Sequence, residues 1–192
     1  MVFSSNYSKV KISPTVSYVY TKHLGSAVKI HRIQNTNNKL GGEYTKRYHP
    51  DKLIQTISIN EDIQTIAEIE LLSFIENKNK HSIDSVLIDV RLKEQYNKET
   101  IPSAINIPLS LIEDKHKLDK ICILLDINQE SAKNIILFDD GVWSNDVNKF
   151  IDIFLKSNYP KTKIYYYRGG IQMWKILGLT TVSPNFTTKE KH

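Results

Sequence analysis

The sequence has 192 residues, a single cysteine and a formal net charge of +5. This length suits one domain, with or without an extension, and is enough to bury a sizeable hydrophobic core. The 40% hydrophobic and 24% charged fractions exclude collagen-like, wholly disordered and membrane-channel proteins. A single cysteine, Cys122, excludes an intramolecular disulfide and any cysteine-based zinc or iron–sulfur cluster. We expect neither a metal nor a cofactor.

Targeting signals are absent from the sequence as written. No run approaches the roughly 18 apolar residues of a transmembrane helix, and the N-terminus lacks the apolar stretch and small-residue cleavage site of a secretory signal. We therefore expect a cytoplasmic protein without membrane contact, or a periplasmic one if a leader has been trimmed. Basic residues are spread among acidic or apolar neighbours, so a dedicated nucleic-acid site is not expected. The expected partner is a protein or a small anionic ligand.

The first third of the chain shows little periodicity. Residues 1–60 are expected to form an irregular extension of strands and loops, in which Val16–Tyr20 and Val28–Ile30 alternate as strands do. From Thr65 the pattern predicts a helix, because Thr65–Glu68 fits a capping box. The apolar residues that follow recur with helical spacing, at Ile66, Ile69, Leu72 and Ile75.

Four short apolar runs are expected to form buried strands. Near-continuous apolar runs are typical of parallel sheets, because helices cover both faces of such sheets. The clearest helix between them has apolar residues at i, i+3, i+4 and i+7 from Val147 to Phe154, with Ser144 as its expected N-cap. Alternating strands and helices predict an α/β domain over residues 61–182, followed by a flexible tail over 183–192. The four runs are Val86–Val90, Ala104–Ile107, Asn134–Phe138 and Lys163–Tyr167.

The loop after the third of these runs is the candidate functional site. It joins a buried strand to an amphipathic helix at the carboxyl end of the strand, where open α/β sheets bind ligands. Backbone N–H groups and the helix dipole at such a junction favour an anion or a thiolate. The loop is either an active-site loop or an ordinary turn in which an Asp caps the helix. Its residues are Asp139, Asp140, Gly141, Val142, Trp143 and Ser144.

Three blocks of the sequence resemble the rhodanese-like (sulfurtransferase) family in order and spacing. Leu87–Arg91 reads Leu-Ile-Asp-Val-Arg, Ile101–Pro108 reads Ile-Pro-Ser-Ala-Ile-Asn-Ile-Pro, and Tyr167–Trp174 contains a Gly-Gly-x-x-x-Trp signature. The resemblance covers over half of the chain and implies a five-stranded, mainly parallel sheet flanked by helices. Gly41–Tyr44 and the ending Leu177–Val182 resemble a bacterial single-domain subgroup with an N-terminal extension.

The candidate loop departs from this family. Active members carry a catalytic Cys at its first position, where loop amides lower the thiol pKa and the Cys accepts sulfur as a persulfide. Aligned on Phe138 and Trp143, that position holds Asp139 in this sequence, and Ser144 stands at a second Cys position. Cys122 lies in an apolar stretch before the loop and is expected to be a core residue. A carboxylate forms no stable persulfide, so the resemblance implies a loss of the family's chemistry.

We therefore predict a catalytically inactive rhodanese-like domain that acts as a binding or regulatory module. Arg91 either lines the pocket or ties loops together with Asp89, and Arg168 either meets an anionic ligand or pairs with a loop carboxylate. Two alternatives stay open. One is a related enzyme with altered chemistry that uses Asp139 and Asp140 or binds a cation, and the other is a scaffold for which the pocket is irrelevant. The expected ligand-binding residues are Asp139, Asp140, Trp143, Ser144, Arg168 and Arg91.

Overall fold

A five-stranded parallel sheet forms the centre of the protein. The computed structural model describes residues 10–35, 59, 61–80, 84–125, 133–157 and 159–184. The strand order is β3-β7-β6-β4-β5, and every pairing between these neighbours is parallel. The predicted α/β fold is therefore confirmed. The strands are β3 (Gln64–Ile66), β4 (Ser85–Asp89), β5 (Ile105–Asn106), β6 (Asn134–Phe138) and β7 (Ile164–Tyr167).

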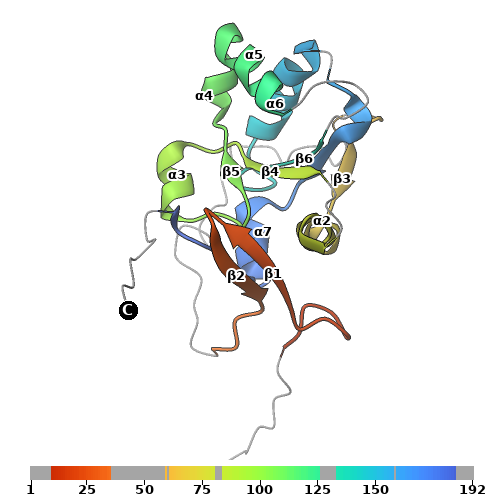
Figure 1. Cartoon of the computed structure of the whole chain (residues 1–192), viewed down its shortest axis with the longest axis vertical. Helices are drawn as coiled ribbons and strands as arrows, with labels where there is room; N and C mark the ends of the chain where they lie inside the picture. Colours follow the sequence, from red (N-terminus) through yellow and green to blue (C-terminus); the bar gives the residue numbers. More distant parts are fainter. Residues whose placement is uncertain are drawn as a thin grey trace, which may run out of the picture.

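Helices cover both faces of this sheet (Figure 1). One face carries α4 (Leu109–Ile112), α5 (Lys115–Leu124) and α6 (Asp146–Phe154), and the other carries α2 (Glu68–Lys80) and α7 (Gly170–Ile176). A short helix, α3 (Lys93–Lys98), follows β4, and two 3-10 helices, η1 (Leu155–Ser157) and η2 (Lys161–Lys163), precede β7. No helix within the described ranges is both long and apolar enough to cross a membrane.

The central strands send alternate side chains into two separate cores. Ile88 of β4 and Leu137 of β6 belong to the core under α5 and α6. Their neighbours Leu87 and Phe138 belong to the core under α2 and α7, together with Trp174. All five side chains are almost completely buried. Burial on both faces explains why these strands are near-continuous apolar runs in the sequence.

The described residues 10–35 contain an antiparallel hairpin that packs beside α2 and α7. Its inward side chains Val19 and Ile30 are buried in the core under α2 and α7. The hairpin is also tied to the segment after α7, because His31 and Thr180 are joined by hydrogen bonds from both backbone N–H groups and the Thr180 hydroxyl. Gly41–Tyr44 and most of the predicted tail lie outside the described residues. The hairpin strands are β1 (Tyr18–His23) and β2 (Ser26–His31).

The predicted start of the first helix is wrong. Thr65 is part of strand β3, and α2 begins at Glu68. The N–H of Ala67 is bound by the carboxylate of Glu70, so the cap lies two residues later than the sequence pattern suggested. Ile69 is 44% exposed and does not share the buried face. The chain changes from strand to helix within a few residues, and the helical spacing continued across that change by coincidence.

Candidate functional site

The loop from Asp139 to Ser144 lies at the carboxyl end of β6, beside two other central strands. Asp139 is completely buried, whereas Asp140, Trp143 and Ser144 are half-buried. The loop therefore has a closed interior formed by its first residue and a partly exposed rim formed by later residues.

The carboxylate of Asp139 accepts hydrogen bonds from one N–H of the loop, one N–H of α6 and one loop hydroxyl. Its Oδ1 accepts the N–H of Gly141 at 3.0 Å, and its Oδ2 accepts the N–H of Val147 at 3.2 Å. The hydroxyl of Ser144 donates a further hydrogen bond to this carboxylate. Val147 is the second residue of α6, so a side chain from before the loop caps the helix and interacts with the positive end of its dipole.

Burial dominates the acidity of Asp139. Desolvation raises the pKa of this carboxyl to about 7, and the hydrogen bonds from Val147, Ser144 and Gly141 offset only part of the rise. The nearby charge of Asp146 raises the pKa further. The neutral donors thus give the carboxylate hydrogen bonds, but these bonds do not fully offset the free-energy cost of removing the charged group from water.

The N-cap prediction for α6 is wrong by one residue. The helix begins at Asp146, and Asn145 occupies the N-cap position without a side-chain hydrogen bond. Ser144 still contributes, because its Oγ accepts the N–H of Asp146 at 3.3 Å. The N–H of Val147, which an N-cap side chain commonly binds, is already bound by Asp139.

Gly170 allows the loop to lie directly on the start of α7. The N–H of Ile171 binds the carbonyl of Asp139 at 3.0 Å, and the N–H of Gln172 binds that of Asp140 at 3.1 Å. A Cβ atom on Gly170 would lie 2.5 Å from the carbonyl oxygen of Asp139, and the φ angle of +56° is also unfavourable for other residues. Gly170 of the Gly-Gly motif is therefore a packing requirement of the loop.

Arg91 is buried and serves as a structural tie. Its Nε and Nη2 bind Oδ1 and Oδ2 of Asp89 at 2.9 and 2.7 Å, and Nη2 also binds the carbonyl of Glu99 at 2.7 Å. The hydroxyl of Thr100 donates to the same Asp89 carboxylate at 2.8 Å. These contacts fix the segment after β4 to the segment before β5. Thr100 was not singled out from the sequence, where only its place beside the family motif marks it.

Asp140 points to different partners from Asp139. Its Oδ2 accepts a hydrogen bond from Nε2 of Gln95 at 3.0 Å, and its Oδ1 lies 3.6 Å from Nη1 of Arg91. Gln95 was also missed, since a polar residue in a short helix gives no sequence signal of this contact. The two adjacent carboxylates thus lie in different environments. No group of three or more metal-ligating side chains is found in the described ranges.

Arg168 follows β7 and is half-buried on the same end of the sheet. Burial raises the pKa of the Tyr166 hydroxyl, Asp139 raises it further, and the charge of Arg168 partly lowers it. Arg168 and Asp139 therefore both act electrostatically on Tyr166, whose hydroxyl is buried without a hydrogen-bond partner among the described residues. The pairing of Arg168 with a loop carboxylate stays a prediction.

Cys122 lies far from this loop. It is buried on α5, as expected, and burial raises the pKa of its thiol. Its hydrogen-bond partner is Ser157, beyond the C-terminal end of α6, whereas Asp139 caps the N-terminal end. The nine residues of that helix span about 14 Å. A buried thiol with a raised pKa is a poor nucleophile.

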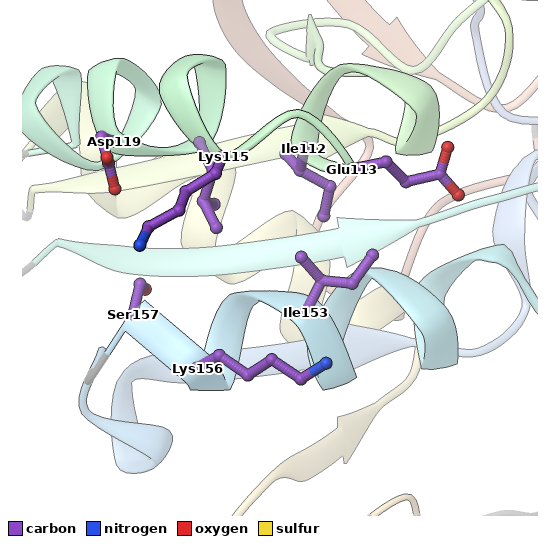
Figure 2. A pocket seen from close by; sticks show the side chains of 8 residues that line it. Ile112, Glu113, Lys115, Asp119, Ile153, Lys156 and Ser157 are labelled. Atoms are coloured by element: carbon purple, nitrogen blue, oxygen red, sulfur yellow. The ribbon is translucent and has the colours of Figure 1, made fainter.

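A groove of about 490 Å³ lies between α5 and α6, near Cys122 (Figure 2). Ile112, Leu118 and Ile153 supply apolar walls, and Lys115 and Asp119 carry opposite charges at the rim. In Figure 2 the ammonium group of Lys115 points across the groove toward η1. The groove is at the opposite end of α6 from the loop and shows no preference for one sign of charge.

Comparison with known proteins agrees with this architecture. The family model of the rhodanese-like domain matches residues 70–177. A crystal structure of a Bacillus halodurans protein has a TM-score of 0.50 at 21% identity, with 64% of this chain and 78% of that chain covered. The rhodanese-like domain of an Anabaena protein has a TM-score of 0.48 at 16% identity, with 67% and 85% covered. No curated protein matches. The family match spans more than half of this chain, and the chain therefore belongs to the rhodanese-like domain family.

Proposed function

We propose that this chain is a catalytically inactive rhodanese-like domain that acts as a binding or regulatory module. One observation carries the proposal. At the position where active relatives resembling this sequence have their Cys, Asp139 is completely buried and accepts the N–H groups of Gly141 and Val147. Two N–H groups that could hold an anionic sulfur species are therefore bound to a carboxylate of the chain itself.

Sulfur transfer needs a thiolate at this position. The thiolate attacks the outer sulfur of thiosulfate, the sulfur–sulfur bond of thiosulfate breaks, and sulfite leaves with the electron pair. A carboxylate oxygen at Asp139 does not form a stable bond of this kind. Cys122, the only thiol of the chain, is buried on α5 and has a raised pKa.

The rim supplies the proposed contact surface. Asp140, Trp143 and Ser144 are half-buried and accessible to a partner, whereas Asp139 and Arg91 are buried and orient the loop from inside. Above its pKa of about 7, the ionised Asp139 repels small anions, so a protein partner fits this surface better than an anionic ligand. We further propose that residues 61–182 form the domain that presents it.

A related enzyme with altered chemistry is the second candidate. The pKa of Asp139 near 7 favours it, because a general acid or base works best near the operating pH. The complete burial of the carboxyl opposes it, since a catalytic group must touch the substrate.

Replacing Asp139 tests the proposal that the domain is inactive because it lacks the catalytic Cys. Asp139→Cys restores a thiol beside the N–H groups of Gly141 and Val147, and we expect it to gain one sulfur atom from thiosulfate by intact-mass measurement. Asp139→Ser, which is similar in size but forms no persulfide, is the matched control. A gain of sulfur by the unmodified chain would refute the proposal.

A thermal-shift series tests whether the Asp139 loop is closed to small anions. Phosphate, sulfate and thiosulfate should not raise the melting temperature of the unmodified chain, because Asp139 already binds the N–H groups of Gly141 and Val147. Asp139→Ser removes this carboxylate and should make the chain responsive to the same anions. Stabilisation of the unmodified chain by these anions, with no further gain in Asp139→Ser, would instead show an open anion site.

A further inference from the structure

The described N-terminal segment, residues 10–35, is strongly basic. Residues 10–35 contain four Lys or Arg side chains and no Asp or Glu, against a net charge of +5 for the whole chain. Two of these cations, Lys22 and Lys29, lie on the β1–β2 hairpin. Such a one-sided distribution is typical of segments that meet a polyanionic surface.

The outer face of the hairpin combines this charge with exposed aromatic rings. Tyr18, Tyr20 and Lys22 alternate with the buried residues of β1, and Lys29 lies opposite Tyr20 on β2. Tyr18 is 45% and Tyr20 is 58% exposed, with ring centroids 5.1 Å apart. The ammonium group of Lys29 lies 4.3 Å from the ring centroid of Tyr18. Glu76 of α2 lines a groove with these two rings and borders the face.

The tip of the hairpin presents an exposed leucine in an unfavourable backbone conformation. The two-residue turn consists of Leu24 and Gly25, with φ angles of +47° and +84°. Turns with two positive φ angles favour Asn or Asp before Gly, and a Leu there costs free energy. Leu24 is 60% exposed, so packing inside the protein does not account for it. A local outlier of this kind points to a function.

We propose that the outer face and tip of this hairpin bind an anionic membrane surface. Leu24 enters the boundary between headgroups and acyl chains, and the amphipathic rings of Tyr18 and Tyr20 lie at the headgroup level. Lys22 and Lys29 meet the anionic headgroups. This contact lies on one leaflet and needs no spanning helix. It replaces the expectation of no membrane contact, which considered spanning segments, and it does not depend on the proposed function of the Asp139 loop.

A lipid surface fits this face better than a nucleic acid does. Phosphate contacts of a nucleic acid would use the lysines, but they would give no role to an apolar side chain at the tip. Lipid gives a role to Leu24, to the rings and to the lysines together.

Co-sedimentation of the full chain with vesicles tests the proposal. We expect binding to vesicles of three parts phosphatidylcholine to one part phosphatidylglycerol, and not to phosphatidylcholine alone. Added salt should weaken this binding, because exposed charges are screened. Lys22→Ala combined with Lys29→Ala should lower the partition coefficient by about 30-fold, from about 1 kcal/mol per basic residue.

Leu24→Asn separates membrane binding from folding. Asn suits a positive φ angle, so the melting temperature should stay equal or rise, whereas vesicle binding should fall by about ten-fold as the apolar contact is lost. Lys115→Ala combined with Lys117→Ala removes the same charge from α5 and should change binding by less than about two-fold.

Three outcomes with vesicles would overturn the proposal. They are no binding to anionic vesicles at low salt, unchanged binding of Leu24→Asn, or a loss of binding in the α5 control as large as that in the variant lacking Lys22 and Lys29. Tight binding of a single-stranded uridine oligonucleotide without vesicle binding would also overturn it.

Discussion

Two buried carboxylates at the same end of the sheet are stabilised in different ways. Asp89 ends β4, Asp139 follows the neighbouring strand β6, and both are fully buried. Asp89 faces the guanidinium of Arg91 in a two-point ion pair. Asp139 is bound by two backbone N–H groups and a hydroxyl, all of them neutral.

The difference separates a carboxylate that ties two segments together from one that, on the proposed function, stands where active relatives have a reactive group. A buried charge paired with a cation holds two segments together, and its sequence context matches the family motif. A buried charge held only by neutral donors keeps a raised pKa, as at Asp139. It lies where the resemblance expects a thiolate, in a loop whose amide donors suit an anion of either kind.

Removing the cation that pairs with Asp89 should have the largest effect on stability. Arg91→Ala leaves the Asp89 carboxylate buried without its partner, and we expect a loss of about 3–5 kcal/mol in the free energy of unfolding. Urea denaturation measures this loss. Lys161→Ala removes an exposed pair with Asp62 and should cost less than about 1 kcal/mol. Equal losses in the two variants would contradict the structural role of Arg91.

The raised pKa of Asp139 should make the stability of the fold depend on pH. The folded pKa of Asp139 is about 7, above its ordinary value of 3.8, so between these values the folded chain binds a proton that the unfolded chain does not. Stability should therefore fall as pH rises from about 4 to about 7, by at most about 4 kcal/mol. Asp139→Asn should flatten this part of the profile in a series of denaturation curves. An unchanged slope in Asp139→Asn would assign the effect to other groups.

Gly170→Ala tests whether the close contact between the Asp139 loop and the start of α7 keeps this loop closed. The new Cβ would meet the carbonyl of Asp139 at 2.5 Å, and we expect a loss of about 3 kcal/mol from overpacking and backbone strain. Gly25→Ala is the matched control, because its φ angle is also positive but nothing lies within 4 Å of the new Cβ. The control should cost about 1 kcal/mol. Equal costs would mean that the loop is not tightly docked on α7.

A smaller contrast separates the interior from the rim. Thr100→Val removes a buried hydrogen bond to the Asp89 carboxylate and should cost about 2 kcal/mol. Gln95→Ala removes a half-buried hydrogen bond to Asp140 and an exposed one from the N–H of Leu92, and should cost about 1 kcal/mol. Chemical denaturation of the two variants in parallel gives the comparison, and a larger cost for Gln95→Ala would show that the rim is more ordered than its exposure indicates.

The sequence was most informative where burial is simple. Asn134–Phe138 was predicted as a strand with the bounds that the structure has, because a central strand covered on both faces is apolar throughout. β3 was missed, since its three residues run straight into α2 and gave only a helical spacing. Short edge strands depend on pairing with a neighbour, which a local pattern does not contain.

The candidate loop was proposed from its position, but its closure was not predictable. Asp139 was predicted to stand at the Cys position of the family, because the flanking residues align with the family motif. Its complete burial depends on Gly170, some thirty residues later, which brings α7 against the loop. The alternating patterns around Val19 and Ile30 likewise predicted strands, but they did not indicate which core these two side chains enter. Contacts between distant segments are the part that local patterns leave open.

The most direct test of the central claim is a sulfur-transfer assay on the unmodified chain. With thiosulfate and cyanide we predict no thiocyanate, because the loop has no thiol and Cys122 is buried. The Cys122→Ala variant should behave identically in the same assay. Robust thiocyanate formation that persists in Cys122→Ala would contradict the claim, since it would show a nucleophile other than a cysteine working in this domain.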